Sequence, residues 1–173
     1  DMAVAQRGTS TASITSSGYY TADRIRFGVS SFGTWTSTQE SLTSGNAYTD
    51  GFSNAFKIDC TTANASPGAS VSITIGQKFE GQDLQLLKKG TANAEKITVA
   101  FWIKATKTGT FIAELYDHDN TRSCSKAYTV SSSNTWEHKV INFPADTTGA
   151  LDDDNANSLT LFLWQGAGSS FTS

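Results

Sequence analysis

The residues that could do chemistry gather in two short acidic stretches of the chain. His118 lies between Asp117 and Asp119, and three consecutive aspartates occupy positions 152–154. Carboxylate oxygens are ligands that Ca²⁺ prefers in proteins. Neighbouring side chains of a turn diverge, however, and an aspartate run in a Ser/Asn-rich loop commonly keeps that loop solvated. We therefore expect solvated turns without a metal or other cofactor, and a structural Ca²⁺ at Asp117, Asp119, Asp152 and Asp154 is the alternative.

The motifs of common active sites are absent. The chain has no G-x-S-x-G, no H-E-x-x-H and no phosphate-binding loop. His138 shares one face of a predicted strand with Trp136, so we interpret it as a satisfied structural histidine. A pair of carboxylates for glycoside hydrolysis is not excluded, but no pattern places two of them across a cleft. We predict that the chain is not an enzyme.

The aromatic residues divide into a core group and a group that could bind sugar. An exposed aromatic ring stacks on the apolar C–H face of a sugar, while polar side chains bond its hydroxyl groups. We expect core or sheet-face packing for Phe101, Trp102, Phe111, Trp136 and Phe143. The candidate ligand-binding residues, in loops or on less certain faces, are Trp35, Tyr48, Tyr19, Tyr20 and Trp164.

The composition restricts the classes of function. The 173 residues fit one domain, 17% of them are charged, and the net charge is −3. A weakly acidic chain lacks the basic surface that nucleic-acid binding needs. The longest apolar run, at 99–103, is too short to cross a bilayer. We therefore expect no nucleic-acid partner and no membrane insertion.

The two cysteines, Cys60 and Cys124, both fall in predicted strands. A disulfide between them is one alternative. Two free thiols are the other, since free cysteine is a common buried residue.

Period-two alternation of apolar residues predicts strands along most of the chain. The expected strands lie at 2–6, 23–29, 34–40, 52–61, 71–79, 95–103, 110–116, 122–130, 136–143 and 158–164. Polar segments separate them, including a long Ser/Thr/Gly-rich loop at 7–21. The last strands before the acidic loop, from 95 to 143, read as a four-stranded antiparallel meander.

One short helix is expected at 82–89. Asp83 suits its first turn, Lys88 and Lys89 suit its last turn, and Gly90 suits its end. Many short strands with one small helix predict an all-β fold, an antiparallel β-sandwich of jelly-roll type. We expect a single domain over residues 1–173, which reads as an ordered fragment of a longer chain.

Several segments together resemble a family of bacteriophage virion proteins, common in marine phages and often described as tail-fibre or structural proteins. They are A-V-A-Q-R-G-T-S near the start, D-G-F-S-N-A-F-K-I, F-E-G-Q-D-L-Q-L-L-K-K-G-T-A-N-A, F-W-I-K-A-T-K-T-G-T-F-I-A-E-L-Y-D and N-T-W-E-H-K-V-I-N-F-P-A-D-T-T-G. The last two also resemble jelly rolls of the carbohydrate-binding-module kind. The resemblance spans nearly the whole chain.

The resemblance implies a virion surface protein, a tail fibre or appendage that presents a carbohydrate- or receptor-binding β-sandwich for host attachment. A capsid decoration protein or another purely structural virion subunit is the first alternative, and an accessory domain of a polysaccharide depolymerase is the second. The expected partners are other virion proteins, further copies of the chain in a homo-oligomer, and a host-surface glycan. The expected location is the surface of the extracellular particle.

Overall fold

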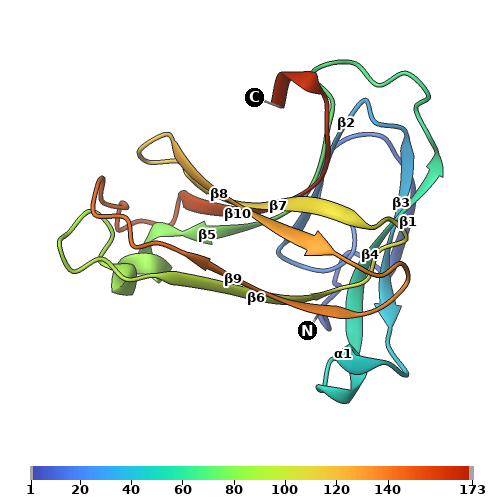
Figure 1. The fold of residues 1–173 in the computed structure, drawn as a ribbon, viewed down its shortest axis with the longest axis horizontal. Helices are drawn as coiled ribbons and strands as arrows, with labels where there is room; N and C mark the ends of the chain where they lie inside the picture. Colours follow the sequence, from blue (N-terminus) through green and yellow to red (C-terminus); the bar gives the residue numbers. More distant parts are fainter. Residues whose placement is uncertain (1, 172–173) are drawn as a thin grey trace. The chain divides into compact units, whose positions relative to one another are not determined.

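A computed structural model describes residues 2–171, and almost all regular structure in it is β-strand (Figure 1). The strands are β1 (Ser10–Ile14), β2 (Ile25–Ser30), β3 (Thr34–Ser41), β4 (Asn54–Thr62), β5 (Ser72–Glu80), β6 (Ile97–Ile103), β7 (Gly109–Asp117), β8 (Arg122–Val130), β9 (Glu137–Phe143) and β10 (Asn157–Ala167). The helical segments are α1 (Asn46–Thr49), η1 (Gly81–Leu87) and η2 (Ser169–Phe171). The predicted all-β antiparallel sandwich is confirmed.

The chain divides into two compact units. Unit 1 contains residues 2–76 and 164–171 of the described chain, and unit 2 contains residues 77–163. The strands β5 and β10 each contribute residues to both units. The single domain expected over residues 1–173 stays a prediction.

Unit 1 has an antiparallel sheet in the order β1-β3-β4. Its buried core combines Ile14 of β1, Phe27 and Val29 of β2, and Ile73 of β5. Tyr20, Phe32, Trp35, Phe56 and Ile58 pack around these four side chains. The core therefore joins the three-stranded sheet to β2 and β5, as two faces of a sandwich bury their apolar sides against each other.

Unit 2 has its own core between two sheets. One sheet is the β6–β9 pair, and β7 and β8 pair in the other, next to β10. The buried side chains of this core are Ala113, Leu115, Tyr128, Val130, Ile141, Phe143 and Leu159. They come from both sheets, so unit 2 is a small sandwich in its own right.

The predicted meander from 95 to 143 is wrong, because its four strands belong to different sheets. β6 pairs with β9. The strands β7 and β8, which lie between them in the sequence, pair with each other. The connections between them run together: Asn134 N–H donates to the Ala105 carbonyl at 2.8 Å and the Ser133 hydroxyl to the Thr106 carbonyl at 2.9 Å. Both connections cross from one sheet to the other, which gives the nested pairing typical of a jelly roll.

Two further expectations about the elements are corrected. The expected strand at 2–6 is absent, and β1 lies instead inside the segment expected to be a loop. The Gln39 amide holds the early segment by donating to the carbonyls of Met2 and Ala3, at 2.7 and 2.9 Å, so side-chain bonds replace a strand ladder there.

The helix expected at 82–89 is a 3₁₀ helix, η1, and it ends earlier. Lys88 closes it in the left-handed region at φ 49°, two residues before the glycine expected to stop it. Leu84 packs on the core of unit 2, whereas Leu86 is 85% exposed. No helix among residues 2–171 has the length and apolar character needed to cross a membrane.

Candidate functional site

The outward face of the β6–β9 sheet brings chemically useful side chains together on unit 2. Every second residue of β6 packs on the core: Ile97, Val99, Phe101 and Ile103. Their neighbours Thr98, Ala100 and Trp102 therefore point to the opposite side. On β9 the residues opposite these three are Asn142, Val140 and His138. Since these three β9 residues are exposed, this face is solvated.

Two aromatic rings lie side by side at one end of this face. Trp102 is directly opposite His138 in the strand register, and the ring centroids are 5.1 Å apart with a tilt of 39° between the planes. Beyond them, the Lys104 ammonium lies 5.9 Å from the centroid of the Trp136 ring. Cross-strand aromatic pairs of this kind form a broad apolar platform.

The other end of the face is polar. The Thr98 hydroxyl donates to the Asn142 side-chain carbonyl at 2.8 Å. Between this pair and the rings lies Val140, which is 56% exposed. From Thr98 to Lys104 the face extends for about 20 Å, at roughly 3.3 Å per strand residue. It thus combines a row of apolar surface with amide and hydroxyl groups at one end and a cation at the other.

The structure changes the interpretation of three residues. Phe143 is buried, and Phe101 and Phe111 pack on the core as expected. Trp102 and Trp136 do not belong to that core and are each half-buried. His138, expected to be a satisfied structural histidine, is exposed. The alternation of β6 already placed Trp102 on the side of Thr98 and Lys104, and that polar side was the signal for a solvated ring.

The aromatic residues predicted to bind ligand lie in unit 1, at separate places. Trp35 packs against the core edge-on to Phe27, at 5.7 Å between centroids, and its Nε1–H donates to the Phe32 carbonyl at 2.9 Å. Tyr20 also packs on this core, and its hydroxyl donates to the Ser16 carbonyl at 2.6 Å. These two rings are therefore engaged in packing.

The other three candidates of that group have different surroundings. The Arg7 guanidinium lies 5.7 Å from the ring centroid of Tyr19. Tyr48 is on α1 and is 47% exposed. The ring of Trp164 is 5.3 Å from that of Phe171. The role of the five residues in ligand binding stays a prediction.

The Asp117 carboxylate, one of the expected Ca²⁺ ligands, already has a cationic partner. It is buried, and Lys89 Nζ lies 2.5 Å from its Oδ2 atom. The same ammonium is 3.2 Å from Asp146 Oδ2 and donates to the Gly149 carbonyl at 2.7 Å. Asn120 donates to Asp117 through its backbone N–H and its side-chain amide. A lysine thus occupies the place where a metal ion would neutralise Asp117.

Asp146 extends this charge network in unit 2. Burial alone would raise the pKa of Asp146. The hydrogen bond from Thr148 N–H, the Lys89 ammonium and the Arg122 guanidinium outweigh burial, and together they lower that pKa. Arg122 lies 3.2 Å from Asp146 Oδ1 and donates to the Thr148 carbonyl at 2.6 Å. The network therefore favours a charged carboxylate.

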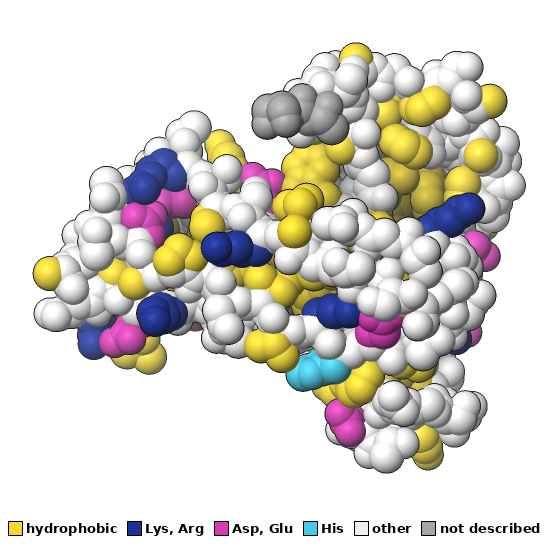
Figure 2. Space-filling model, in the orientation of Figure 1, with side chains coloured by type: hydrophobic (Ala, Val, Ile, Leu, Met, Phe, Trp, Pro, Cys, Tyr) yellow, Lys and Arg dark blue, Asp and Glu magenta, His cyan; other side chains and the backbone are white. Residues whose placement is uncertain are grey.

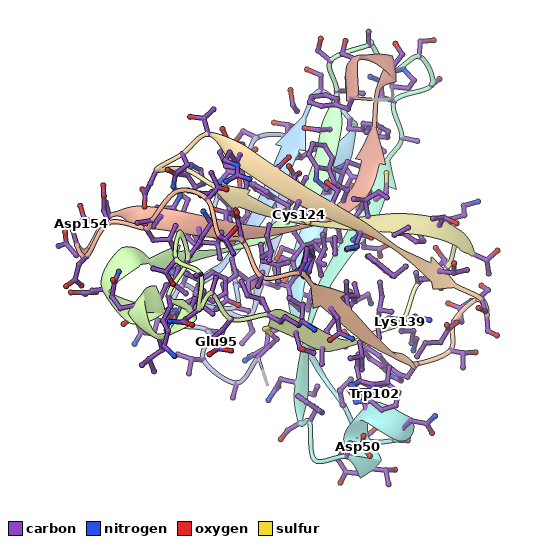
Figure 3. The ribbon with its side chains drawn as sticks, turned by 60° about the vertical axis from the view of Figure 1, so that its left-hand side comes forward. Asp50, Glu95, Trp102, Cys124, Lys139 and Asp154 are labelled. Atoms are coloured by element: carbon purple, nitrogen blue, oxygen red, sulfur yellow. The ribbon has the colours of Figure 1, made fainter. Side chains whose placement is uncertain are left out.

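The remaining acidic candidates serve the loops that carry them. Asp119 accepts a hydrogen bond from Asp152 N–H at 3.0 Å, and Asp154 accepts one from Ala156 N–H at 2.9 Å. Figure 3 shows Asp154 at the outer end of the loop before β10. Within residues 2–171 there is no group of three or more His, Cys, Asp or Glu side chains that could hold a metal ion.

His118, between the two aspartates, is tied to β10. Its Nε2 atom lies 2.8 Å from the Thr160 hydroxyl, and its ring is edge-on to Tyr116 at 4.7 Å. Partial burial and the charge of Lys78 lower the pKa of His118, against the opposing effect of Asp119 and Asp117. The neutral ring is therefore favoured, which suits a structural hydrogen bond.

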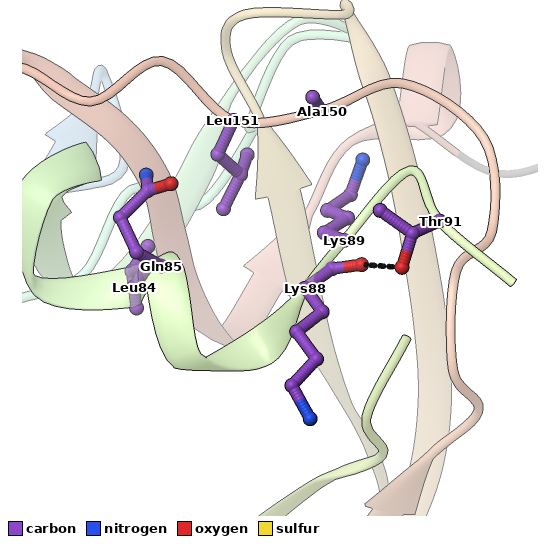
Figure 4. Close-up of a pocket in the computed structure, with 7 residues that line it drawn as sticks. All are labelled: Leu84, Gln85, Lys88, Lys89, Thr91, Ala150 and Leu151. Atoms are coloured by element: carbon purple, nitrogen blue, oxygen red, sulfur yellow. Dashed lines mark hydrogen bonds between the residues drawn. The ribbon is translucent and has the colours of Figure 1, made fainter. Parts of the chain in front are cut away.

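A pocket of about 170 Å³ lies beside η1 (Figure 4). Its lining residues are Leu84, Gln85, Lys88, Lys89, Thr91, Ala150 and Leu151. The side chains of Lys88 and Lys89 point to opposite sides in this view, and the Thr91 hydroxyl donates to the Lys88 carbonyl at 2.7 Å. Pockets for small ligands are usually about 300 Å³ or more. Since the Lys89 ammonium is already paired, this pocket is a weak candidate.

The charges and thiols add no further site. On the face that Figure 2 presents, basic and acidic side chains are scattered among polar ones without a continuous basic patch. Cys60 and Cys124 are free thiols, the first exposed and the second half-buried.

The strongest candidate site is the outward face of the β6–β9 sheet, called the β6–β9 face below. It is formed by Thr98, Trp102, Lys104, Trp136, His138, Val140 and Asn142.

Comparisons with known proteins identify no relative. No protein-family model, no curated protein and no solved structure matches the chain.

Proposed function

We propose that the chain is a surface protein of a bacteriophage virion, in a tail fibre or other appendage, that binds a host carbohydrate through its β6–β9 face. The sequence resemblance to phage virion proteins supports the virion location. The single observation that carries the binding role is the Trp102–His138 ring pair on a solvated side of a sandwich.

The chemistry of the face suits a sugar chain. Sugar rings present apolar C–H surfaces that stack on aromatic planes, and Trp102 offers the largest such plane here. Asn142 and Thr98 supply donors and acceptors of the kind that sugar hydroxyl groups bond. Lys104 and His138 would favour a glycan that carries carboxylate groups over a neutral one. The ligand class proposed is therefore an extended, acidic surface polysaccharide.

A glycan array with the whole chain tests this role. We expect binding to acidic glycans, a loss of about tenfold or more for Trp102→Ala because the stacking plane is removed, and a smaller loss for His138→Ala. Leu86→Ala, which truncates another exposed apolar side chain of unit 2, is the matched control and should bind like wild type. Circular dichroism should show that each variant is folded.

Two results would contradict the proposal. Binding that survives Trp102→Ala but disappears in Tyr48→Ala would move the site to α1 of unit 1. A folded wild-type chain that binds no glycan would favour the structural alternative, for which the 56% exposed Val140 is the supporting observation. In that case the same face would contact another virion protein, and Val140→Asp would abolish co-assembly with virion proteins.

A further inference from the structure

The strand β4 is an open edge of the sheet in unit 1. Its only strand neighbour in the described chain is β3, and the register is regular from Trp35 opposite Cys60 to Ser41 opposite Asn54. At its start the Met2 N–H donates to the Asn54 carbonyl at 3.4 Å. Beyond that point no described strand pairs with the outer side of β4. Such an edge is a template for another strand.

The side chains of β4 divide between its two faces. Phe56 and Ile58 pack on the core of unit 1. Lys57 and Asp59 alternate with them and are exposed. A basic and an acidic side chain therefore lie two residues apart on the solvated face, on either side of Ile58.

We propose that β4 pairs antiparallel with β4 of a second copy of the chain, with Ile58 opposite Ile58 on the two-fold axis. In this register Lys57 of each copy lies opposite Asp59 of the other. Directly opposed side chains of opposite charge stabilise an antiparallel pair. The contact is self-complementary, as a two-fold interface requires, and it would join two three-stranded sheets into one. This inference does not depend on the proposed carbohydrate binding.

Other sheet edges fit a second copy less well. β1 has only five residues, and its register shifts where Ser13 has φ 57°, so it is shortened and bent. β8 carries Arg122 and Lys126 without an acidic residue opposite in a two-fold pairing of its own. On β9, Glu137 and Lys139 already bond each other at 2.6 Å. β4 is the long, regular and charge-balanced edge.

Lys57 already has a partner within the chain. Its ammonium lies 3.7 Å from Glu40 Oε2 on β3, and both side chains are about half-exposed. Exposed pairs of this kind contribute little to stability. Lys57 can therefore keep this contact, or give it up, when it meets the Asp59 carboxylate of a second copy.

Charge reversal tests both the interface and its register. By sedimentation of the whole chain at low salt in reducing buffer, we expect a dimer for wild type. Lys57→Asp and Asp59→Lys should each raise the dimer Kd by about tenfold or more, because like charges then face each other. The double variant Lys57→Asp/Asp59→Lys should dimerise like wild type. Asp50→Lys, a charge reversal at the residue that follows α1, is the matched control and should leave the dimer intact.

Mixing the two single variants gives the sharpest result. Each chain of the mixed pair then carries two like charges, and the two chains carry opposite ones. We expect the mixture to dimerise with a Kd close to that of wild type, although each variant alone has the raised Kd. Loss of association through unfolding would not be restored in this way.

Three results would overturn the proposal. They are a monomeric wild type at the highest soluble concentration, single variants that still dimerise, and a mixture that stays monomeric. In a parallel run without reductant, a disulfide-linked dimer through Cys60 that Lys57→Asp leaves intact would also overturn it, because the two Cys60 residues face each other only in a different register.

Discussion

At the scale of single residues, Lys89 is a nearly buried cation of unit 2 with two carboxylate partners. Its side chain is 10% exposed and that of Asp117 is 4% exposed. The ammonium also contacts Asp146 and two backbone carbonyls, of Thr148 and Gly149. A buried charge is tolerated only when its partners are all in place. The Lys89 network therefore holds the segment after η1, the end of β7 and the loop after β9 in one arrangement.

Removal of the Lys89 charge should destabilise the chain strongly. Lys89→Met leaves the Asp117 carboxylate buried without its cation, which we expect to cost about 3–5 kcal/mol. The double variant Lys89→Met/Asp117→Asn should lose less than Lys89→Met alone, since the unpaired charge is gone. Urea unfolding followed by circular dichroism measures the free energy of unfolding.

Lys88→Met is the control for this series. Lys88 is 54% exposed and its ion pair with Glu95 is on the surface, so its loss should change stability by less than about 0.5 kcal/mol. Equal losses for Lys88→Met and Lys89→Met would contradict the assignment of Lys89 to a buried network.

The sequence indicates which residues could bind a cation or a ligand more easily than it indicates which groups these residues contact. The sequence shows the acidic turn at Asp117 and offers a bound Ca²⁺ there as an alternative. The actual cation is a lysine from a distant segment, which no local pattern reveals. The exposure of Trp102 is only partly predictable. Alternation along β6 gives the face on which the ring lies, but it does not show that this face is solvated.

At the scale of elements, η1 depends on a glycine at its first position. Gly81 is buried, and a Cβ atom there would lie 1.9 Å from the Asp152 carbonyl oxygen and 2.6 Å from Ser158 Oγ. The Gly81 N–H also donates to the Ala156 carbonyl at 3.3 Å. The helix thus begins where the backbone is pressed against the loop before β10, and no larger residue fits.

Gly81→Ala should therefore destabilise unit 2. Overpacking of this kind costs about 1–3 kcal/mol because the backbone must shift. Gly68→Ala is the comparison, since the nearest atom to its Cβ would be 4.0 Å away, and we expect almost no loss. Thermal unfolding of both variants beside wild type measures the difference. A Gly81→Ala protein as stable as Gly68→Ala would show that the loop moves freely.

The sequence predicted most strands well and their pairing poorly. The predicted strands match β2 to β10 within a few residues, and for most of them the signal is the alternation that leaves one face of the strand apolar. β1 was missed because its short sequence of Ser, Thr and Ala carries no such pattern. Pairing of β6 with β9 depends on contacts between connections far apart in the chain, which periodicity does not contain.

At the scale of the whole molecule, acid should unfold the chain by two effects. The net charge of −3 becomes strongly positive as 16 carboxylate side chains are protonated, and self-repulsion then opposes the compact state. The second effect is specific. The pKa of Asp146 is lowered in the folded state, so the unfolded state binds more protons in acid. The free energy of unfolding therefore decreases as the pH is lowered.

Asp146→Asn should reduce the acid sensitivity of the chain. The stabilisation due to Asp146 is complete well above its ordinary pKa of about 3.9 and is lost as the pH falls through the lower folded-state value. We expect the variant to be less stable than wild type at neutral pH but to lose less stability between about pH 5 and pH 3. Melting temperatures across this range provide the measurement. The exposed Asp153→Asn is the control, and an unchanged slope for Asp146→Asn would contradict the prediction.

The division of the chain has a consequence for its synthesis on the ribosome. Unit 2 is an insertion between the two sequence segments of unit 1. All residues of unit 2 have been made once position 163 is added, but unit 1 still lacks the last four residues of β10 and the segment after them. Domains generally fold in the order of their synthesis, N-terminal first. Here the carbonyls of Val71 and Ala69 in unit 1 accept their hydrogen bonds from the N–H groups of Gly168 and Ser170, so these bonds can form only after all of unit 2 has been made.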